Sequence, residues 1–212
     1  MECMKMKLFL LENRKSNFQV AIANFGRICY HIPTFRLKID RRCFHVQKRA
    51  RFRVSDNYVR FYLHYIEPRR EAVARGLFEF SSVEQLPGLH AFYGLQFENL
   101  VLNHINDLFP LLGIDKSLVL SAFPYVQAQT KQQRGCQIDL LIQTQRTLIV
   151  VEIKRRMEIG YEVVEEVAEK MNRLVHDKTL SVRTALVYDG RLSPRIEADR
   201  FFDFIIPADR LF

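Results

Sequence analysis

Apolar residues recur with two different spacings along the second half of the chain, and the changes in spacing predict its elements. Two segments, 89–109 and 160–175, have apolar residues every three or four positions, which predicts helices. Shorter apolar runs bounded by polar residues predict five strands, at 118–126, 135–142, 148–154, 183–188 and 201–206. This order of helix, three strands, helix and two strands predicts an α/β fold.

The first half of the chain has a different pattern. Apolar and basic residues alternate through 35–54, which predicts two strands with a turn at 40–42. Such a basic hairpin is either the wing of a winged-helix domain or an ordinary two-stranded ribbon. Helical spacing follows, with Ser55 or Asp56 as N-cap. We therefore divide the chain into a basic N-terminal segment that is a candidate winged-helix remnant, a helical connector and a main α/β domain, at 1–54, 55–88 and 89–212.

Three charged residues lie inside two of the predicted apolar strands. Asp139 is in the first of them, and Glu152 and Lys154 are in the second. Because side chains alternate along a strand, Glu152 and Lys154 share one face. A hairpin turning at 145–146 pairs Thr144 with Thr147 and sets Asp139 opposite Glu152.

Two opposed carboxylates predict a cation between them. Directly opposed Cβ atoms lie about 4.5–5.5 Å apart, where like charges destabilise the pair. Mg2+ binds carboxylate oxygens and keeps several waters, so the residues predict a site for Mg2+ or Mn2+ beside Lys154. The alternative is an edge strand whose charges prevent aggregation, and the residues leave both interpretations open.

Charge is distributed unevenly along the chain. The net charge is +8, but residues 1–78 hold 17 Lys and Arg against 6 Asp and Glu. This excess favours a polyanion such as DNA as the partner, although a solvated basic face or an acidic protein partner would also account for it. The residues predicted to contact nucleic acid are Arg41, Arg42, Lys48, Arg49, Arg51 and Arg53.

Several classes of protein are disfavoured. The four cysteines and six histidines show neither Cys-x-x-Cys nor His-Glu-x-x-His spacing, which argues against structural zinc and a disulfide framework. There is no apolar run of about 18 residues and no signal-peptide pattern, so no membrane association is expected and a cytoplasmic location is predicted. A P-loop sequence is also absent.

Asp139 on one strand followed by Glu152-Ile153-Lys154 on the next resembles the PD-(D/E)xK nuclease superfamily. Within it, the chain is similar to the C-terminal region of archaeal-type AAA ATPases, without their ATPase module. The stretches that carry this narrower resemblance are 52–61, 66–68, 93–98 and 134–139.

The resemblance implies a restriction-endonuclease-like core of helix, three strands, helix and strand. It implies metal ligation by Asp139, Glu152, the Ile153 carbonyl and Glu98, with Lys154 orienting or activating the attacking water. The implied reaction is metal-dependent hydrolysis of DNA. The alternative is a non-catalytic DNA- or protein-binding module. A fragment that associates with a separate P-loop ATPase subunit is a further alternative, and the oligomeric state is left open.

Overall fold

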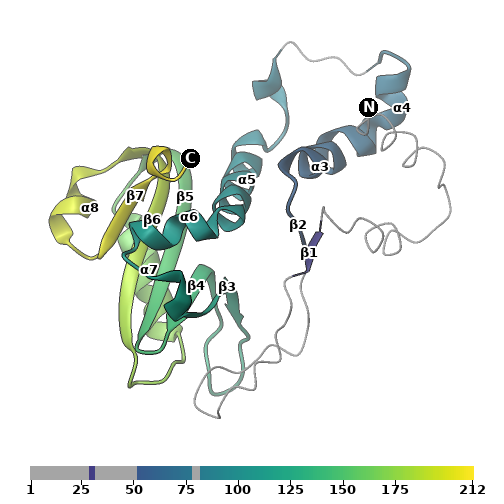
Figure 1. Ribbon diagram of the computed structural model, residues 1–212. Helices are drawn as coiled ribbons and strands as arrows, with labels where there is room; N and C mark the ends of the chain where they lie inside the picture. Colours follow the sequence, from purple (N-terminus) through teal and green to yellow (C-terminus); the bar gives the residue numbers. More distant parts are fainter. Residues whose placement is uncertain (1–28, 32–51, 78–81) are drawn as a thin grey trace.

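The structure, a computed structural model, describes residues 29–31, 52–77 and 82–212 (Figure 1). The predicted turn at 40–42 lies outside these ranges, as do five of the six basic residues expected to contact nucleic acid, Arg41, Arg42, Lys48, Arg49 and Arg51. No helix among the described residues is long and apolar enough to span a bilayer.

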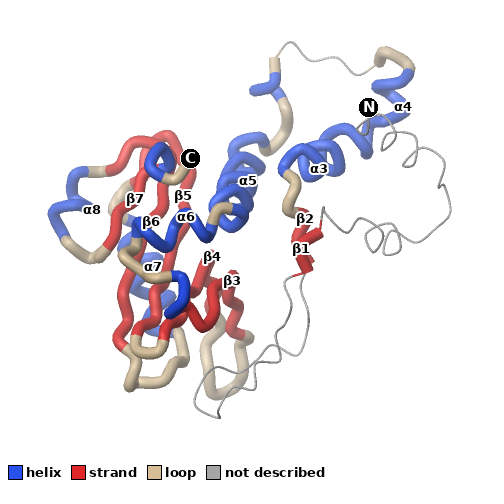
Figure 2. Tube along the Cα trace, in the orientation of Figure 1, coloured by secondary structure: helices blue, strands red, loops and turns tan. Residues whose placement is uncertain are grey.

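A five-stranded mixed sheet forms the centre of the main domain (Figure 2). Its strands, which neighbour one another in chain order, are β3 (Val119–Gln127), β4 (Cys136–Thr144), β5 (Thr147–Ile159), β6 (Ser181–Leu192) and β7 (Phe204–Pro207). The first three are antiparallel, whereas β5, β6 and β7 are parallel. The α/β expectation and all five predicted strands are confirmed.

Helices cover both faces of this sheet. One face packs α5 (Leu89–Asn103) and α6 (Ile105–Leu111) against β-strand residues that include Val151. The other face packs α7 (Glu162–Arg173) against residues that include Val150. Since neighbouring residues of β5 are buried on opposite faces, the strand is apolar almost throughout its first half, as is typical of a covered sheet.

The structure corrects the prediction of one continuous helix over 89–109. The helix breaks at His104, and Pro110 lies inside the second helix rather than after it. The break allows Leu108 and Phe109 to enter the same core cluster as Val101. After β6, a short helix that was not predicted, α8 (Pro194–Asp199), leads into the last strand.

The N-terminal part that the structure describes leads from a small ribbon into a helical connector. Its elements are β1 (Cys29–His31), β2 (Phe52–Val54), α3 (Asn57–Phe61), a π-helical turn (Tyr62–Ile66), a 3-10 turn (Glu67–Arg69) and α4 (Arg70–Ala74). The strands pair antiparallel. Asp56 is the N-cap, because its carboxylate accepts a hydrogen bond from the backbone of Val59 at 3.0 Å. Short 3-10 turns follow at Val83–Gln85, Lys116–Leu118 and Ala208–Arg210.

Candidate active site

The hairpin of β4 and β5 has the predicted register. Leu140 pairs with Val151, which is the alignment that brings Asp139 level with Glu152. The ladder between the two strands stops there, and Oδ2 of Asp139 accepts a hydrogen bond from the backbone N–H of Ile153 at 2.9 Å. A carboxylate thus satisfies a strand amide at the point where pairing ends.

A β-bulge explains why Asp139 is presented at this point. Between the pairs Phe123–Leu141 and Tyr125–Ile138, β3 advances by two residues and β4 by three. The extra residue of β4 therefore lies in the stretch 139–140, opposite Pro124, which has no N–H to donate. A bulge re-aims side chains next to it, and sequence reasoning missed this one, although a proline inside an apolar strand was its signal.

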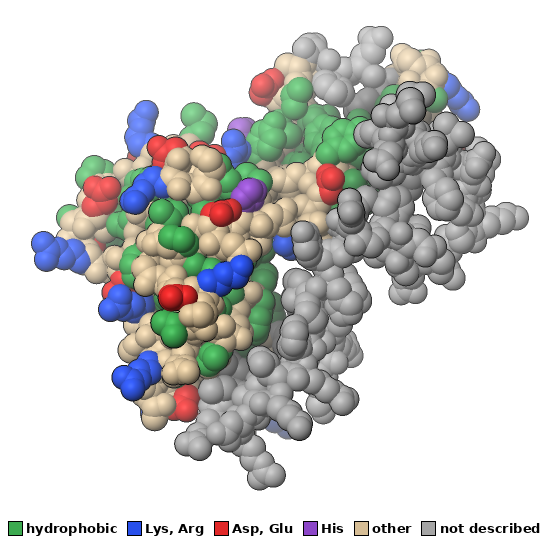
Figure 3. Space-filling view, in the orientation of Figure 1, with side chains coloured by type: hydrophobic (Ala, Val, Ile, Leu, Met, Phe, Trp, Pro, Cys, Tyr) green, Lys and Arg blue, Asp and Glu red, His purple; other side chains and the backbone are tan. Residues whose placement is uncertain are grey.

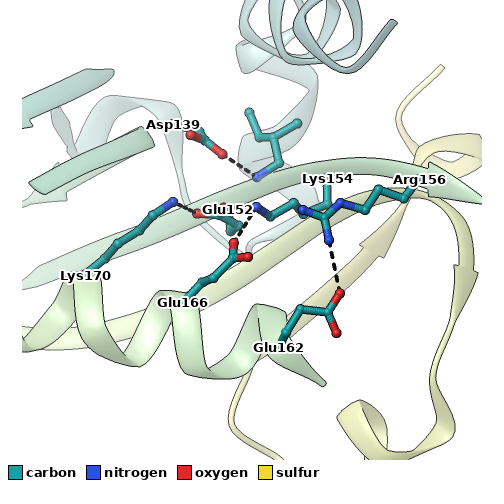
Figure 4. A network of polar contacts seen from close by, with 8 residues as sticks. Asp139, Glu152, Lys154, Arg156, Glu162, Glu166 and Lys170 are labelled. Carbon is teal, nitrogen blue, oxygen red and sulfur yellow. Dashed lines mark hydrogen bonds and ion pairs between the residues drawn. The ribbon is translucent and has the colours of Figure 1, made fainter. Parts of the chain in front are cut away.

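Glu152 is a buried carboxylate held by two lysines (Figure 4). Its side chain is 1% exposed; Oε1 lies 3.0 Å from the Lys154 ammonium and Oε2 lies 2.5 Å from the Lys170 ammonium. The Lys154 ammonium also lies 2.6 Å from Oε2 of Glu166. Burial lowers the pKa of Lys154, but the two acids outweigh it, so the net shift is upward and this lysine stays charged.

The contacts around Glu152 belong to a regular pairing of β5 with α7 (Figure 4). Alternate residues of the strand pair with helix residues four apart: Arg156 with Glu162, Lys154 with Glu166, and Glu152 with Lys170. Two residues of a strand span about 6.6 Å and four residues of a helix about 6 Å, so the two repeats match. Sequence reasoning missed Glu166 and Lys170, although both follow Glu162 at four-residue spacing.

One open cleft of about 1280 Å³ joins the predicted catalytic residues. Asp139, Glu152 and Lys154 line it from the strands, and Glu98 lines it from α5. Burial raises the pKa of the Glu98 carboxyl, while Arg60 opposes that shift. Within the described residues, no three Asp, Glu, His or Cys side chains are gathered as a metal-binding group, so Glu98 shares the cleft but does not complete a three-acid cluster.

Asp139 and Glu152 nevertheless provide carboxylate oxygens, which are suitable ligands for a hard cation. Burial, followed by repulsion from Glu152, raises the pKa of Asp139 to about 7, against the opposing charge of Lys170. The charged form of Asp139 is therefore disfavoured mainly because the carboxyl is buried. Within the described chain, Oδ1 of Asp139 makes no hydrogen bond, so this carboxylate oxygen is one that Mg2+ can accept when waters complete its shell.

Replacing Asp139 with asparagine is expected to stabilise the metal-free protein at neutral pH. Because the folded-state pKa is about 7 and the reference value is 3.8, wild type loses stability as pH rises through this interval. The variant avoids that loss and keeps an oxygen for the Ile153 amide. In urea unfolding, the free energy of unfolding of the variant should exceed that of wild type by roughly 2 kcal/mol at about pH 8, and this difference should disappear at about pH 4. A gain that is independent of pH would contradict this explanation.

Cations on the walls of the cleft are engaged by neighbouring side chains. Arg155 lies 4.7 Å from the centre of the Tyr93 ring and pairs with Asp189 at 2.7 Å. Arg173 pairs with Glu169 at 2.5 Å. On the face seen in Figure 3, basic and acidic side chains are interspersed over the described part of the molecule.

Arg53, the predicted nucleic-acid contact that the structure describes, joins β2 to α5. Its guanidinium donates to the side chain and the backbone carbonyl of Asn99, and to Oδ1 of Asn103 at 3.0 Å. Asn99 in turn donates to the carbonyl of Ser55 at 2.7 Å. These contacts are those of a residue that docks the N-terminal part on the main domain.

No protein-family model and no curated protein sequence matches this chain. Among solved structures, the chain is similar to the crystal structure of protein VC1899 from Vibrio cholerae, at 14% identity and a TM-score of 0.42. The match covers 72% of this chain and 42% of that protein. At this level of similarity the comparison carries no inference about the function of the cleft.

Proposed function

We propose that this chain is a metal-dependent nuclease of the PD-(D/E)xK type that hydrolyses phosphodiester bonds in DNA. The observation that carries the proposal is the convergence of Asp139, Glu152 and Lys154 on one cleft, with Lys154 in contact with the buried Glu152. The order of α5, three antiparallel strands, α7 and a parallel strand supports a restriction-endonuclease-like core.

In this proposal, catalysis depends on charged groups that are already fixed in the cleft before the substrate binds. Asp139, Glu152 and the Ile153 carbonyl would hold a divalent cation, which supplies Lewis-acid stabilisation and a more acidic water when bound. The Lys154 ammonium, fixed between Glu152 and Glu166, would donate to a phosphate oxygen or to the attacking water. A donor held in place in this way stabilises the charge of the transition state without reorganisation.

The basic tract 35–53, of which the structure describes only the last two residues, would supply the contact with DNA. The described face in Figure 3 mixes both signs of charge, whereas residues 1–78 carry the excess of Lys and Arg. Phosphate contacts made by such a tract release counterions and depend on salt. Association with a separate P-loop ATPase subunit is a separate alternative, which co-purification with a P-loop protein would test.

The proposal is tested by incubating plasmid and linear DNA with the full chain in Mg2+ or Mn2+. We expect cleavage that chelation abolishes and that Asp139→Asn reduces about 100-fold, because a ligand oxygen with its charge is lost. Asparagine preserves the acceptor for the Ile153 amide, so the variant should remain folded. Equal cleavage by wild type and variant would assign the activity to a contaminant and remove the proposal.

A second function, binding of DNA or protein without cleavage, is favoured by two observations. Both oxygens of Glu152 are already paired with lysines, and no three-acid group is assembled in the described residues. This function would be selected if wild type and Asp139→Asn both bind DNA in a salt-sensitive way and neither shows metal-dependent cleavage.

A further inference from the structure

The two lysines that hold Glu152 are anchored differently. Lys154 contacts two carboxylates, those of Glu152 and Glu166, and its side chain is 18% exposed. Lys170 has a single ion-pair partner among the described residues, Glu152, and is 23% exposed on the side of α7 that borders the cleft. Lys154 is therefore fixed from two sides, whereas Lys170 can leave by rotating its side chain towards solvent.

The ammonium of Lys170 also lies where it opposes a divalent cation. It is 2.5 Å from Oε2 of Glu152, and its charge reaches the neighbouring carboxylate of Asp139. A carboxylate oxygen has more than one lone pair, so the contact does not block coordination by itself. A dication at Glu152 would nevertheless lie within a few ångströms of the ammonium, where the two cations repel each other strongly because the site is buried.

We infer that Lys170 is an internal counter-ion that competes with the divalent cation for Glu152. Without metal, Lys170 neutralises a carboxylate that burial would otherwise make costly. When metal binds, the Lys170 ammonium moves to solvent, and Lys154 stays in place on Glu166. The inference rests on the proposed metal site and adds to it a built-in regulator of metal affinity.

The effect on affinity follows from the population of competent sites. If Lys170 occupies Glu152 most of the time, the apparent dissociation constant is raised by the reciprocal of the fraction left open. Lys170→Gln should therefore bind Mn2+ about tenfold more tightly than wild type. Lys170→Arg keeps the charge and should bind no more tightly than wild type.

The measurement is a titration of the metal-free protein, as the full chain of 212 residues, with Mn2+ alone. Binding is monitored by calorimetry or by the spin-resonance signal of free Mn2+. Arg173→Gln is the matched control, because it removes one charge from the same helix and cleft but leaves the Glu152 contacts intact. Its affinity should change by less than about twofold, since this guanidinium pairs with Glu169 and its side chain, at 38% exposed against 23% for Lys170, is better screened by salt.

Thermal unfolding gives a second readout that needs no activity. Without metal, Lys170→Gln should unfold at a lower temperature than wild type, because Glu152 loses one of its two cations. Saturating Mn2+ should raise the unfolding temperature of the variant more than that of wild type.

The outcomes separate this inference from the proposed function. Failure of wild type to bind Mn2+ would overturn both the metal site and the role of Lys170. Binding by wild type with unchanged or weaker binding by Lys170→Gln would overturn the role of Lys170 alone. If Arg173→Gln binds Mn2+ as much more tightly as Lys170→Gln does, the change is a general effect of charge. That result would also overturn the displacement of Lys170 by the metal.

Discussion

Replacing Lys154 with methionine is expected to lower the rate of metal-dependent DNA cleavage by about 100-fold or more, the scale seen when one preorganised transition-state donor is removed. Methionine keeps an unbranched side chain of similar length but cannot donate to a phosphate oxygen or a water. Lys154 is held at 3.0 Å from Glu152 and 2.6 Å from Glu166, so its charge is in place before the reaction. Single-turnover rates at saturating enzyme would measure the loss without interference from product release.

DNA binding by this variant should change little, because the basic tract is untouched. Lys116→Met is the matched control; this lysine is exposed and does not line the cleft, so its rate should equal that of wild type. The stability of Lys154→Met must be measured in parallel, since Lys170 is then the remaining ion-pair partner of Glu152 among the described residues. A folded Lys154→Met protein that cleaves at the wild-type rate would exclude a catalytic role for this lysine.

Gly190→Ala is expected to destabilise the fold by about 3 kcal/mol or more, the scale of severe backbone conflicts. A Cβ on Gly190 would lie 1.7 Å from the carbonyl oxygen of Arg156 and 3.0 Å from the carbonyl carbon. The backbone φ of 137° is also one that residues with side chains rarely adopt. Urea unfolding monitored by circular dichroism would measure the change.

The close approach at Gly190 has a structural cause. From the pair Arg155–Asp189 to the pair Glu158–Arg191, β5 advances by three residues and β6 by two. This bulge presses the backbone of β5 against the glycine and leaves Met157, which lines the cleft, 88% exposed. An added methyl group must therefore separate the strands or shift this wall of the cleft.

Gly94→Ala is the control for this prediction. Gly94 lies within α5, and a Cβ there would meet nothing within 4 Å. Because alanine favours a helix interior over glycine by roughly 1 kcal/mol, this variant should be as stable as wild type or slightly more stable. A Gly190→Ala protein as stable as Gly94→Ala would mean that β5 and β6 do not approach as described.

Much of the hairpin could be predicted because its determinants are local. Apolar runs on both sides of a polar turn predicted β4 and β5, and pairing across that turn predicted the alignment of Asp139 with Glu152. The Asp56 cap was predictable for the same reason, since a cap depends on a few successive residues. Burial on opposite faces was likewise implied by alternation along the strands.

The surroundings of Glu152 were not predictable in this way. Which helix side chains reach it depends on the direction in which α7 crosses β5, and this follows from packing of the apolar face of α7 on the sheet. The break at His104 and the bulge opposite Pro124 also depend on packing, because local spacing alone permits a longer helix and a straight strand.

The sequence by itself thus determined the succession of strands along the chain, the hairpin register and the presence of Asp139, Glu152 and Lys154 at one place, because these depend on neighbouring residues and on the two-residue period of a strand. Only the tertiary structure decided that Glu152 is buried between Lys154 and Lys170, that Glu166 fixes Lys154, and that Glu98 lines the same cleft without completing a three-acid cluster among the described residues. These features depend on distances between elements far apart in the chain, which packing sets and local patterns do not encode.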